Sequence, residues 1–439
     1  MNDDMNPNAR IGRMMAFMRR IDPLPRMIIC PGLDRTFEII KAIVPEMTIH
    51  EYPSGAQCED WTVPLSWEAI SGFIRDKEGQ IIGSLKEHYL FAVPFSEPVN
   101  GWFSKNEIRN HVSYRRDVSN GYALEHRNAY NFQIRDWAIS LPYERWEAMP
   151  EDENYYVHLE ILRQPGAMKV AEYFRPGRSG RIINFCAHID ELCNDDLSGC
   201  AVALELIRSI ANIQNPYYSY QVLLVPEMLG ALFYVYHNRE RVKQTLGMFN
   251  IETVGAGAEW CLKTAFQKGS LVEKVLRLAL SNVGISYREL EFFQGYGNDE
   301  RVLAWPTIGV PGVSLQRFPF HQYHTSEDNW EIIDRGLIME ALQVFELCVD
   351  ILEKDYVPEF TGILQPWLTK HNLYYDCIED PKSFQKFNNL VLFNVNGNNS
   401  ILDLAELAGL KFQEVQNYLE RFVDKGIIRR KPCGHRTNS

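Results

Sequence analysis

Strand-like runs alternate with helix-like runs over residues 156–355, and this alternation constrains the fold more than any other feature of the sequence. The runs YYVHLEIL, GRIINFCAHI and YQVLLVPE have the length and composition of buried strands, whereas LSGCAVALELIRSIAN and LVEKVLRLALSNVG have the length of helices. Strands that alternate with helices form mainly parallel sheets with helices on their faces. We therefore predict an α/β core over residues 156–360.

The segments on either side of this core have different patterns. Apolar residues recur at helical spacing in residues 1–45, which are predicted to add N-terminal helices to the core. Residues 46–155 contain short alternating runs separated by turn residues, and they predict a small, mostly β inserted domain. Residues 378–439 combine helical runs on both sides of Gly409 with the strand-like GIIRR, a pattern typical of a winged helix-turn-helix.

Length and composition fit a multidomain globular protein. The 439 residues, 46% of them hydrophobic, correspond to two to three domains at about 150 residues each. No window holds the roughly 18 consecutive apolar residues that span a bilayer, and the start MNDDMNPNAR lacks the basic-then-apolar order of a signal peptide. We therefore expect a cytoplasmic protein without membrane contact. The nine cysteines are scattered and form no Cys-x-x-Cys pair, which favours reduced, buried thiols.

The charge distribution argues against nucleic-acid binding. With 45 basic and 57 acidic residues, the net charge is −12. The predicted recognition helix, residues 412–425, mixes acidic and basic side chains and lacks the basic stripe that phosphate contacts need. Basic residues gather only after it, at Arg429, Arg430, Lys431 and Arg436. We therefore expect this unit to contact a protein partner or a second copy of the chain.

A polar cluster follows the strand-like run 182–189. His188 and Asp190 lie at the predicted carboxyl end of this strand, and Asp195 lies just before an apolar helix, at the sheet edge where open α/β sheets bind ligands. An imidazole with carboxylates is a zinc-type ligand set, and Asp190 could accept the other N–H of the His188 ring. A helix cap is the alternative interpretation of Asn194 or Asp195, since short polar side chains commonly accept the first N–H groups of a helix.

Four further polar clusters fall at predicted strand ends or in turns. Glu227 ends YQVLLVPE, Glu252 ends MFNIE, and the stretches NDER and HQYHTSEDN hold Asp299 and His324. Taken singly, each residue fits a solvated or satisfied side chain equally well. Five such clusters at sheet ends of one domain favour a shared site over independent caps.

In the order and content of these motifs, the chain resembles the zinc aminopeptidases of the co-catalytic type, whose relatives include bacterial leucyl aminopeptidase, glutamate carboxypeptidase and glutaminyl cyclase. More closely, it resembles a bacterial group with an aminopeptidase-like domain, a small inserted domain and a terminal winged helix, often associated with polysaccharide or natural-product gene sets. The resemblance covers nearly the full length and rests on five stretches: PSGAQCEDWTVPLSW (53–67), NDDLSG (194–199), PEMLGAL (226–232), NDER (298–301) and YHTSEDN (323–329).

The resemblance implies a zinc-peptidase-like α/β fold and a ligand set for zinc. His188 would be the ligand of the His-x-Asp motif, and Asp195 the carboxylate that bridges two metals in the co-catalytic enzymes. Glu252 would be the acidic ligand on a later strand, and His324 the last ligand.

The chain departs from the family pattern at Glu227. The aminopeptidases have two consecutive glutamates there, a general base and then a metal ligand, whereas this chain has Pro226-Glu227-Met228. Aligned without a gap, Glu227 takes the base position and Met228, a poor zinc ligand, replaces the ligand. Shifted by one, Glu227 is the ligand and no base remains. The ungapped alignment is preferred. It leaves only Asp195 and His324 as ligands of the second metal site, so one zinc ion is expected, with two as the alternative.

The resemblance also implies supporting residues. Asp190 would orient the ring of His188, and Asp299 would hydrogen-bond the catalytic carboxylate of Glu227. The seven-residue step from His188 to Asp195 is shorter than the loop usual in the dinuclear enzymes, which leaves the shape of the pocket open.

The sequence indicates the residues that contact substrate less clearly. Arg301, Arg317 and Tyr323 could hold a substrate carboxylate, although roles as surface arginines and a core tyrosine fit them equally well. The aromatic residues of the inserted unit either cover the cleft or fill a small core: Trp61, Trp67, Trp102 and Phe103.

These features together predict a zinc-dependent, aminopeptidase-like hydrolase or amide-processing enzyme for a small amino-acid or peptide-like substrate, with a natural-product or polysaccharide pathway as one setting. Zinc polarises a carbonyl and lowers the pKa of its water, and Glu227 moves the proton. Two alternatives stay open. One is a catalytically degenerate aminopeptidase fold that serves as a binding or scaffold protein. The other is a ligand-sensing regulator that uses the winged helix.

Overall fold

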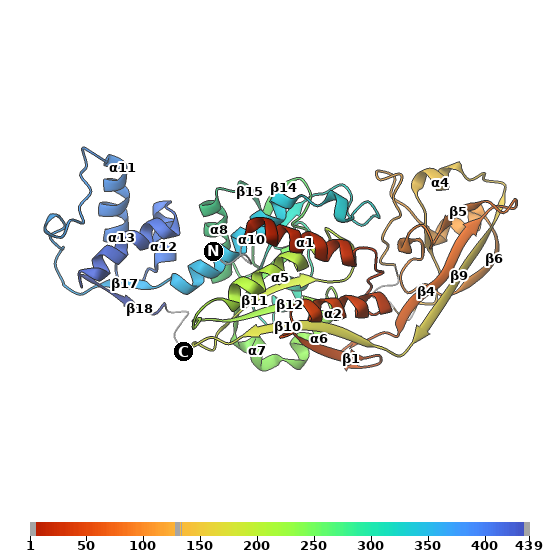
Figure 1. Ribbon diagram of the computed structural model, residues 1–439, viewed down its shortest axis with the longest axis horizontal. Coiled ribbons are helices and arrows are strands. Elements are labelled where there is room, and N and C mark those ends of the chain that lie inside the picture. Colours follow the sequence, from red (N-terminus) through yellow and green to blue (C-terminus); the bar gives the residue numbers. More distant parts are fainter. Residues whose placement is uncertain (1–5, 128–131, 133, 434–439) are drawn as a thin grey trace.

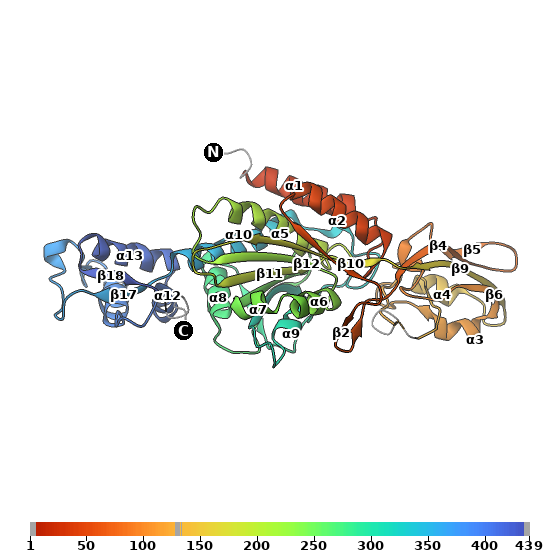
Figure 2. The same cartoon turned by 90° about the horizontal axis from the view of Figure 1, so that it is seen from below.

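The computed structural model describes residues 6–127, 132 and 134–433 of the chain (Figure 1). Three units follow one another along the long axis of the molecule, as Figures 1 and 2 show. A small β-sheet domain lies at one end, a large sheet covered by helices lies in the middle, and a small helical unit lies at the other end. The chain enters and leaves the small β-sheet domain through the central one, and the helical unit follows at the C-terminal side.

The central unit is built on an eight-stranded sheet with the order β1-β10-β12-β11-β13-β16-β14-β15. The four inner strands β12, β11, β13 and β16 pair in parallel, and β15 pairs in parallel with β14 at one edge. Antiparallel pairing joins β1 to β10, β10 to β12 and β14 to β16. The prediction of a mainly parallel sheet is therefore confirmed. The strand bounds are Thr48–Pro53 (β1), Ala167–Arg175 (β10), Ile182–His188 (β11), Ser219–Val225 (β12), Thr245–Glu252 (β13), Glu259–Lys263 (β14), Tyr287–Leu290 (β15) and Gly312–Phe318 (β16).

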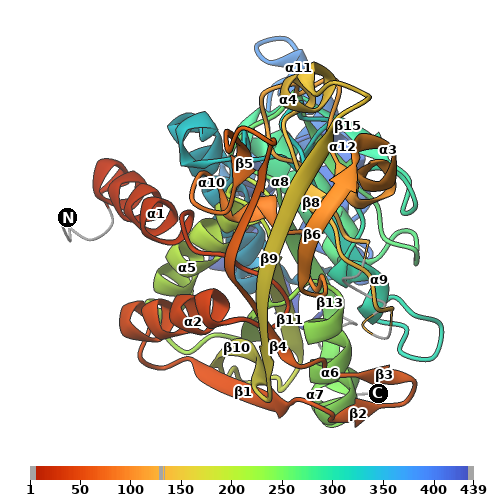
Figure 3. The same cartoon turned by 90° about the vertical axis from the view of Figure 1, so that its right-hand side faces the viewer.

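Helices cover both faces of this sheet. Figure 3 shows α1, α2 and α5 on one side of the strands and α6, α7 and α9 on the other. Helices α1, α5 and α10 pack on one another, and α8 packs on α10. The helix bounds are Pro7–Ile21 (α1), Pro31–Ile43 (α2), Leu197–Ala211 (α5), Leu229–His237 (α6), Arg239–Gln244 (α7), Leu271–Val283 (α8), Asp299–Leu303 (α9) and Arg335–Lys354 (α10).

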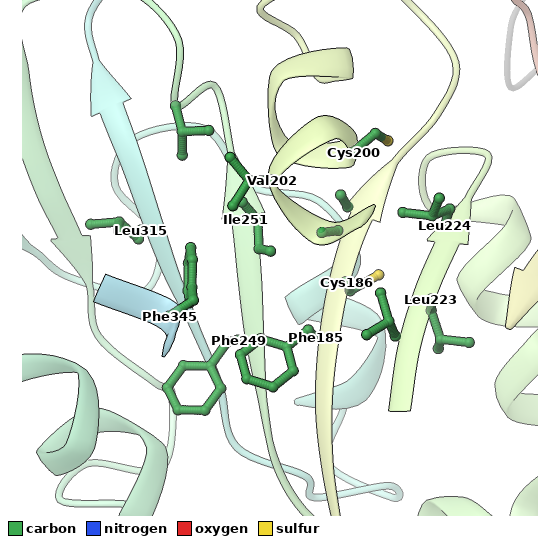
Figure 4. Close-up of a cluster of buried hydrophobic side chains, with 14 of the residues drawn as sticks. Phe185, Cys186, Cys200, Val202, Leu223, Leu224, Phe249, Ile251, Leu315 and Phe345 are labelled. Carbon is green, nitrogen blue, oxygen red and sulfur yellow. The ribbon is translucent and has the colours of Figure 1, made fainter. Parts of the chain in front are cut away.

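The sheet centre forms the main hydrophobic core. Every residue of β11 and β12 is buried, because helices cover both faces of these strands, and their sequences are therefore mainly apolar. The buried polar residues Asn184 and Gln221 are hydrogen-bonded to each other. Phe185 and Phe249 stack with ring centroids 5.1 Å apart, and Phe345 of α10 meets Phe185 edge-on (Figure 4). Cys186 and Cys200 lie in the same apolar cluster. This packing fixes the carboxyl ends of the strands, where the polar clusters lie.

The small domain holds a four-stranded antiparallel sheet with the order β5-β4-β9-β6. Its strands are Ser66–Arg75 (β4), Ile81–Ser84 (β5), Val99–Ser104 (β6) and Asn154–Gln164 (β9). The same region holds the short elements Gln57–Cys58 (β2), Trp61–Thr62 (β3), Lys105–Ile108 (α3), Val112–Ser113 (β7), Ile139–Ser140 (β8) and Tyr143–Ala148 (α4). The strand pairing differs from the predicted division at residues 46 and 155, since β1 joins the central sheet and β9 joins the small one. A strand-like pattern does not specify which sheet the strand joins.

The C-terminal unit places two helices around Gly409, which has φ +57° and ends the first of them. Strand β18 pairs antiparallel with β17, so the unit is closed by the segment that leads into it. The bounds are Val357–Phe360 (β17), Pro381–Ser383 (α11), Phe384–Val391 (a π-helical segment), Ile401–Ala408 (α12), Phe412–Asp424 (α13) and Ile428–Lys431 (β18). Arg436, one of the predicted basic residues, lies outside the described residues, as do residues 1–5 of the N-terminal segment.

The basic residues of strand β18 are paired with acidic side chains. Arg429 and Lys431 both form ion pairs with Glu359, and Arg430 pairs with Glu420. An ion-paired guanidinium or ammonium is a weaker partner for phosphate than a free one.

Among the described helices, none is both long and apolar enough to cross a bilayer.

A buried carboxylate, Glu172 of β10, links the neighbouring strands β1 and β12 to helices α6 and α7. It accepts hydrogen bonds from Gln221 Nε2 (2.6 Å) and Tyr234 Oη (2.7 Å), lies 2.8 Å from His50 Nε2, and pairs with Arg241. Burial disfavours its charge, but these partners outweigh the burial and lower the pKa of Glu172 to about 2. At pH values above its unfolded pKa of about 4.3, the ionised carboxylate therefore stabilises the folded state. This stabilisation is lost as the pH falls through about 2.

We expect Glu172→Gln to lower the free energy of unfolding by about 3 kcal/mol at neutral pH. Because the wild type loses the contribution of the charge as the carboxylate is protonated, the difference from the variant should shrink between about pH 4 and pH 2. Urea unfolding followed by circular dichroism at several pH values measures it. The matched control is Glu51→Gln on the neighbouring strand, whose side chain is 60% exposed. A difference that stays constant with pH would contradict the expectation.

Candidate metal centre

The carboxyl end of β11 and the start of α5 build the first half of the site. The cap of α5 is Asp196, whose Oδ1 accepts the N–H groups of Gly199 (2.9 Å) and Thr253 (3.0 Å). The sequence offers Asn194 or Asp195 as the cap, whereas the residue that caps the helix is the next one, Asp196. A Cβ at Gly199 would lie 2.4 Å from the Asp196 carboxylate, so this position of the Asp-Leu-Ser-Gly stretch requires glycine. Since Asp196 serves the helix, the side chain of Asp195 is left for another role.

Three buried side chains converge beyond β11. His188 Nε2 lies 3.1 Å from Asp195 Oδ1 and 3.5 Å from Glu252 Oε1. Among the described residues, neither ring nitrogen of His188 has a hydrogen-bond partner. Buried polar atoms are almost always hydrogen-bonded, and an imidazole facing two carboxylate oxygens is a donor set suited to zinc. The residues therefore fit a metal ion, as the sequence predicts for His188, Asp195 and Glu252.

Amide side chains hold Glu252 in place at the end of β13. Asn250 Nδ2 donates to Glu252 Oε2 (3.1 Å), and Asn298 Nδ2 donates to the same oxygen. Asn250 also donates to Asn298 Oδ1 (2.8 Å), so the two amides form one network. With Oε2 satisfied by the amides, Oε1 faces His188. Outer hydrogen bonds of this kind orient ligands in metal sites.

Asp195 lies between two groups of side chains. Its Oδ1 faces His188, and its Oδ2 lies 3.2 Å from His324 Nε2. The loop that carries it is anchored by Asp328, whose two oxygens accept the N–H groups of Asn194 (2.6 Å) and Asp195 (3.2 Å). The position between two imidazoles is the one that the resemblance implied for a bridging carboxylate.

The second group contains two residues that sequence analysis missed. Glu191 lies with one oxygen 2.7 Å from His126 Nε2 and the other 3.4 Å from His324 Nε2. Glu191 is buried and directly follows the His-x-Asp motif, which is the one signal that could have drawn attention to it. His126 belongs to the small domain, and no spacing in the sequence connects it with His188 or His324.

Glu227 lies next to both groups. Candidate ligand atoms of Glu227, His188 and Glu191 are within 4.8 Å of one another. Burial raises the pKa of Glu227 well above its usual value, and the neighbouring charge of Glu191 adds to this effect although His188 opposes it. A carboxyl group with a raised pKa is a better proton acceptor at neutral pH than an ordinary one.

Asp190 and Asp299 hold the backbone on both sides of this carboxylate. Asp190 Oδ1 accepts the N–H of Glu227 (2.8 Å) and lies 3.8 Å from His188 Nδ1, which is beyond hydrogen-bond length. Asp299 Oδ1 accepts the N–H of Met228 (2.9 Å). Both residues lie close to the site, but these hydrogen bonds come from the backbone of the Glu227 turn, whereas the sequence predicts contacts with the His188 ring and the Glu227 carboxylate.

The carboxylates give the centre a strong negative potential. Burial disfavours the protonation of His188, but Glu252, Asp190 and Asp195 outweigh it and raise its pKa well above the usual value. Burial likewise opposes protonation of His324, and Glu191 and Asp195 raise its pKa to about 10. In both cases the surrounding charges favour a positive charge at the place where the imidazole nitrogens meet the carboxylates.

Backbone strain is concentrated at this centre. Four non-glycine residues in its loops have left-handed φ values: Glu191 (+76°), Met228 (+56°), Thr253 (+46°) and His324 (+56°). Each follows or lies near the carboxyl end of a strand of the central sheet. Strained residues of this kind cluster at functional sites, where the surrounding structure fixes them.

The residues proposed for substrate contact separate into two sets. Tyr323 lies at the site, stacked on His324 (ring centroids 3.7 Å apart) and on Tyr296 (4.2 Å). Arg317 donates to the carbonyl groups of residues 257 and 258, and Arg301 lies exposed on α9, so neither contacts the centre.

The aromatic residues of the inserted unit take different positions. Trp67 is buried and donates to the carbonyl of Ser96, which fits the core alternative. Trp61 and Phe103 are half-buried and pack against the core, and Trp102 is 48% exposed on the small sheet.

Comparison with known proteins gives four likenesses. The model of the family "Domain of unknown function (DUF4910)" matches residues 15–355. A protein of Clostridium acetobutylicum named "Putative polysaccharide biosynthesis protein with aminopeptidase-like domain" is 25% identical over 422 residues, 94% of each chain. A crystal structure from the same organism, named "putative peptidase", superposes with a TM-score of 0.85 at 22% identity over 98% of both chains. The zinc aminopeptidase BSAP of Bacillus subtilis superposes with a TM-score of 0.59 at 16% identity, over 78% of this chain and 94% of BSAP.

Proposed function

Because this chain belongs to the DUF4910 family, whose name assigns no activity, we propose its function from the chemistry of the metal centre. The protein is a zinc-dependent, aminopeptidase-like hydrolase or amide-processing enzyme that acts on a small amino-acid or peptide-like substrate. The observation that carries the proposal is the convergence of His188, Asp195 and Glu252 beside the carboxyl group of Glu227. The aminopeptidase-like fold of the structural relatives supports it.

In this proposal His188, Asp195 and Glu252 hold zinc, which supplies a Lewis acid for an amide carbonyl and lowers the pKa of water. Glu227 accepts the proton of the attacking water and returns it to the leaving amine. The hydrogen bonds from the backbone of the Glu227 turn to Asp190 and Asp299 fix the position of that carboxylate. Positioning of this kind matters because proton transfer requires the base within hydrogen-bond reach of the water.

The substrate class follows from the surroundings of the centre. Buried carboxylates outnumber imidazoles there, which favours a substrate with a cationic amine over one with a carboxylate alone. Tyr323, stacked on Tyr296, offers an aromatic surface beside His324. A free aminoacyl group on an amide combines these features, and a polysaccharide or natural-product precursor that carries one is a suitable substrate.

Turnover of a panel of aminoacyl and dipeptide amides by zinc-loaded and chelator-stripped protein tests the proposal. We expect hydrolysis by the zinc-loaded form, its loss after chelation, and its recovery on adding zinc back. N-acetylated versions of the same amides are the matched control for recognition of the amine and should react more slowly. Full zinc binding without turnover of any amide would overturn the proposal and favour the binding or scaffold alternative, which is motivated by Met228 in place of a glutamate.

For the C-terminal unit we propose a protein contact or self-association. The ion pairs of Arg429, Arg430 and Lys431 with acidic neighbours support this role over DNA binding. Salt-sensitive binding of the full chain to duplex DNA would overturn it and favour the regulator alternative.

A further inference from the structure

We propose that His126, Glu191 and His324, together with Asp195, form a second site for a zinc-class divalent cation, and that the small domain thus contributes a metal ligand to the centre. The proposal rests on the proposed function through Asp195, which the two sites share. It replaces the expectation that Asp195 and His324 are the only ligands left at the second metal site.

The first support is the geometry of the four side chains. Ligand atoms of His126, Glu191 and His324 lie within 4.8 Å of one another, and His324 Nε2 is 3.2 Å from Asp195 Oδ2. Two imidazoles and two carboxylates provide the four ligands that zinc prefers. Both carboxylates are buried, with side chains 6% exposed at Glu191 and 3% at Asp195.

A cluster of ion pairs without metal is the competing interpretation. In it the buried oxygen Asp195 Oδ2 lies 3.2 Å from His324 Nε2 but forms no hydrogen bond within the part of the chain that the structure describes. A buried carboxylate oxygen without a hydrogen bond is costly, whereas a bound cation would satisfy it. The site therefore accounts for an atom that the ion pairs alone do not satisfy.

Backbone contacts of the small domain position His126 beside Glu191 and His324. The N–H of Leu124 donates to the carbonyl of His324 (2.9 Å), and Ala123 and Thr325 form an antiparallel β-bridge. On the next residues, the N–H of Ser326 donates to the carbonyl of Tyr122 (2.8 Å). These contacts join the two segments independently of any metal, so the approach of His126 to Glu191 is a consequence of chain pairing.

Glu191 is held by a second set of backbone contacts. The buried Arg26 donates from Nη2 to the carbonyl of Glu191 (2.8 Å), and the N–H of Glu191 donates to the carbonyl of Arg26 (3.2 Å). The left-handed backbone at Glu191 is therefore fixed from both sides. In this proposal Glu191 supplies the carboxylate that the aminopeptidase pattern has at the position of Met228.

Zinc stoichiometry of the full chain tests the proposal. Metal-free protein is loaded with zinc and desalted, and zinc per chain is measured by elemental analysis for the wild type, His126→Ala and Glu191→Gln. We expect about two zinc ions in the wild type and about one in each variant. His158→Ala is the matched control, since this histidine of the small domain contacts Ser71 and Asn100 on the small sheet, and it should keep about two.

The outcomes separate this inference from the proposed function. One zinc in the wild type, retained in His126→Ala but lost in His188→Ala, would overturn the second site and leave the first intact. No zinc in the wild type would overturn both. A thermal unfolding scan of metal-free His126→Ala shows whether the variant is folded. If it is not, Co²⁺ titration of folded Glu191→Gln decides: one visible-absorption step supports the second site, and two steps overturn it.

Discussion

Glu227→Gln is expected to reduce kcat for the best aminoacyl amide by about 10²–10⁴-fold while zinc content stays at the wild-type value. Glutamine keeps the size of the side chain and its place between His188 and Glu191, but it cannot accept the proton of the attacking water. Steady-state kinetics and elemental analysis on the same protein preparation measure both quantities. The carboxylate Glu59, 76% exposed, provides the control Glu59→Gln, which should leave both unchanged.

The same experiment separates the two alignments of the Pro226-Glu227-Met228 segment. If Glu227 were a metal ligand, the variant would lose zinc in proportion to activity. Unchanged zinc with reduced kcat assigns it as the base, and unchanged kcat would contradict any catalytic role. A steep dependence of kcat on pH that disappears in the variant would further support the assignment as the base.

Asp195→Ala is expected to have the largest effect on metal binding, with loss of all tightly bound zinc and on the order of a 10⁴-fold or greater loss of activity. The reason is its position, with one oxygen facing His188 and the other facing His324. The fold should persist, because Asp196 and not Asp195 caps α5. Elemental analysis and circular dichroism measure the two expectations.

The exposed Asp424 on α13 gives the control Asp424→Ala, which should keep metal and activity. Zinc that remains at the wild-type level in Asp195→Ala would contradict the assignment of Asp195 as a shared ligand. Loss of half the zinc would place Asp195 in one group only, since a shared carboxylate should affect both.

The sequence predicted the central sheet because its inner strands are buried on both faces. Runs such as Ile182–His188 and Ser219–Val225 are then mainly apolar, and a mainly apolar run of that length next to a helical pattern is typical of a buried parallel strand. The boundaries of the small domain could be predicted less well from the sequence. The strands Thr48–Pro53 and Asn154–Gln164 are identified by their patterns, but their partners lie far away in the sequence, as the pairings of Thr48 with Glu172 and of Arg75 with Tyr156 show.

The site was predictable where its residues lie in local motifs. His188, Asp195, Glu252 and His324 each follow a strand or belong to a recognisable stretch, and the structure brings their side chains together. His126 lies in a segment without such a motif, and its approach depends on the pairing of residues 122–124 with residues 324–326. Tertiary pairing of this kind leaves no periodic signal in a single sequence.

The left-handed backbone at Glu191, Met228, Thr253 and His324 sets stability against activity within one site. Glycine would adopt these φ values without the cost of about 1–3 kcal/mol that a side chain incurs at each position. A screen for thermal stability alone would therefore accept glycine at Glu191 and His324, and would remove a carboxylate and an imidazole from the centre. The part of this protein easiest to stabilise is thus the part that loses its chemistry when stabilised.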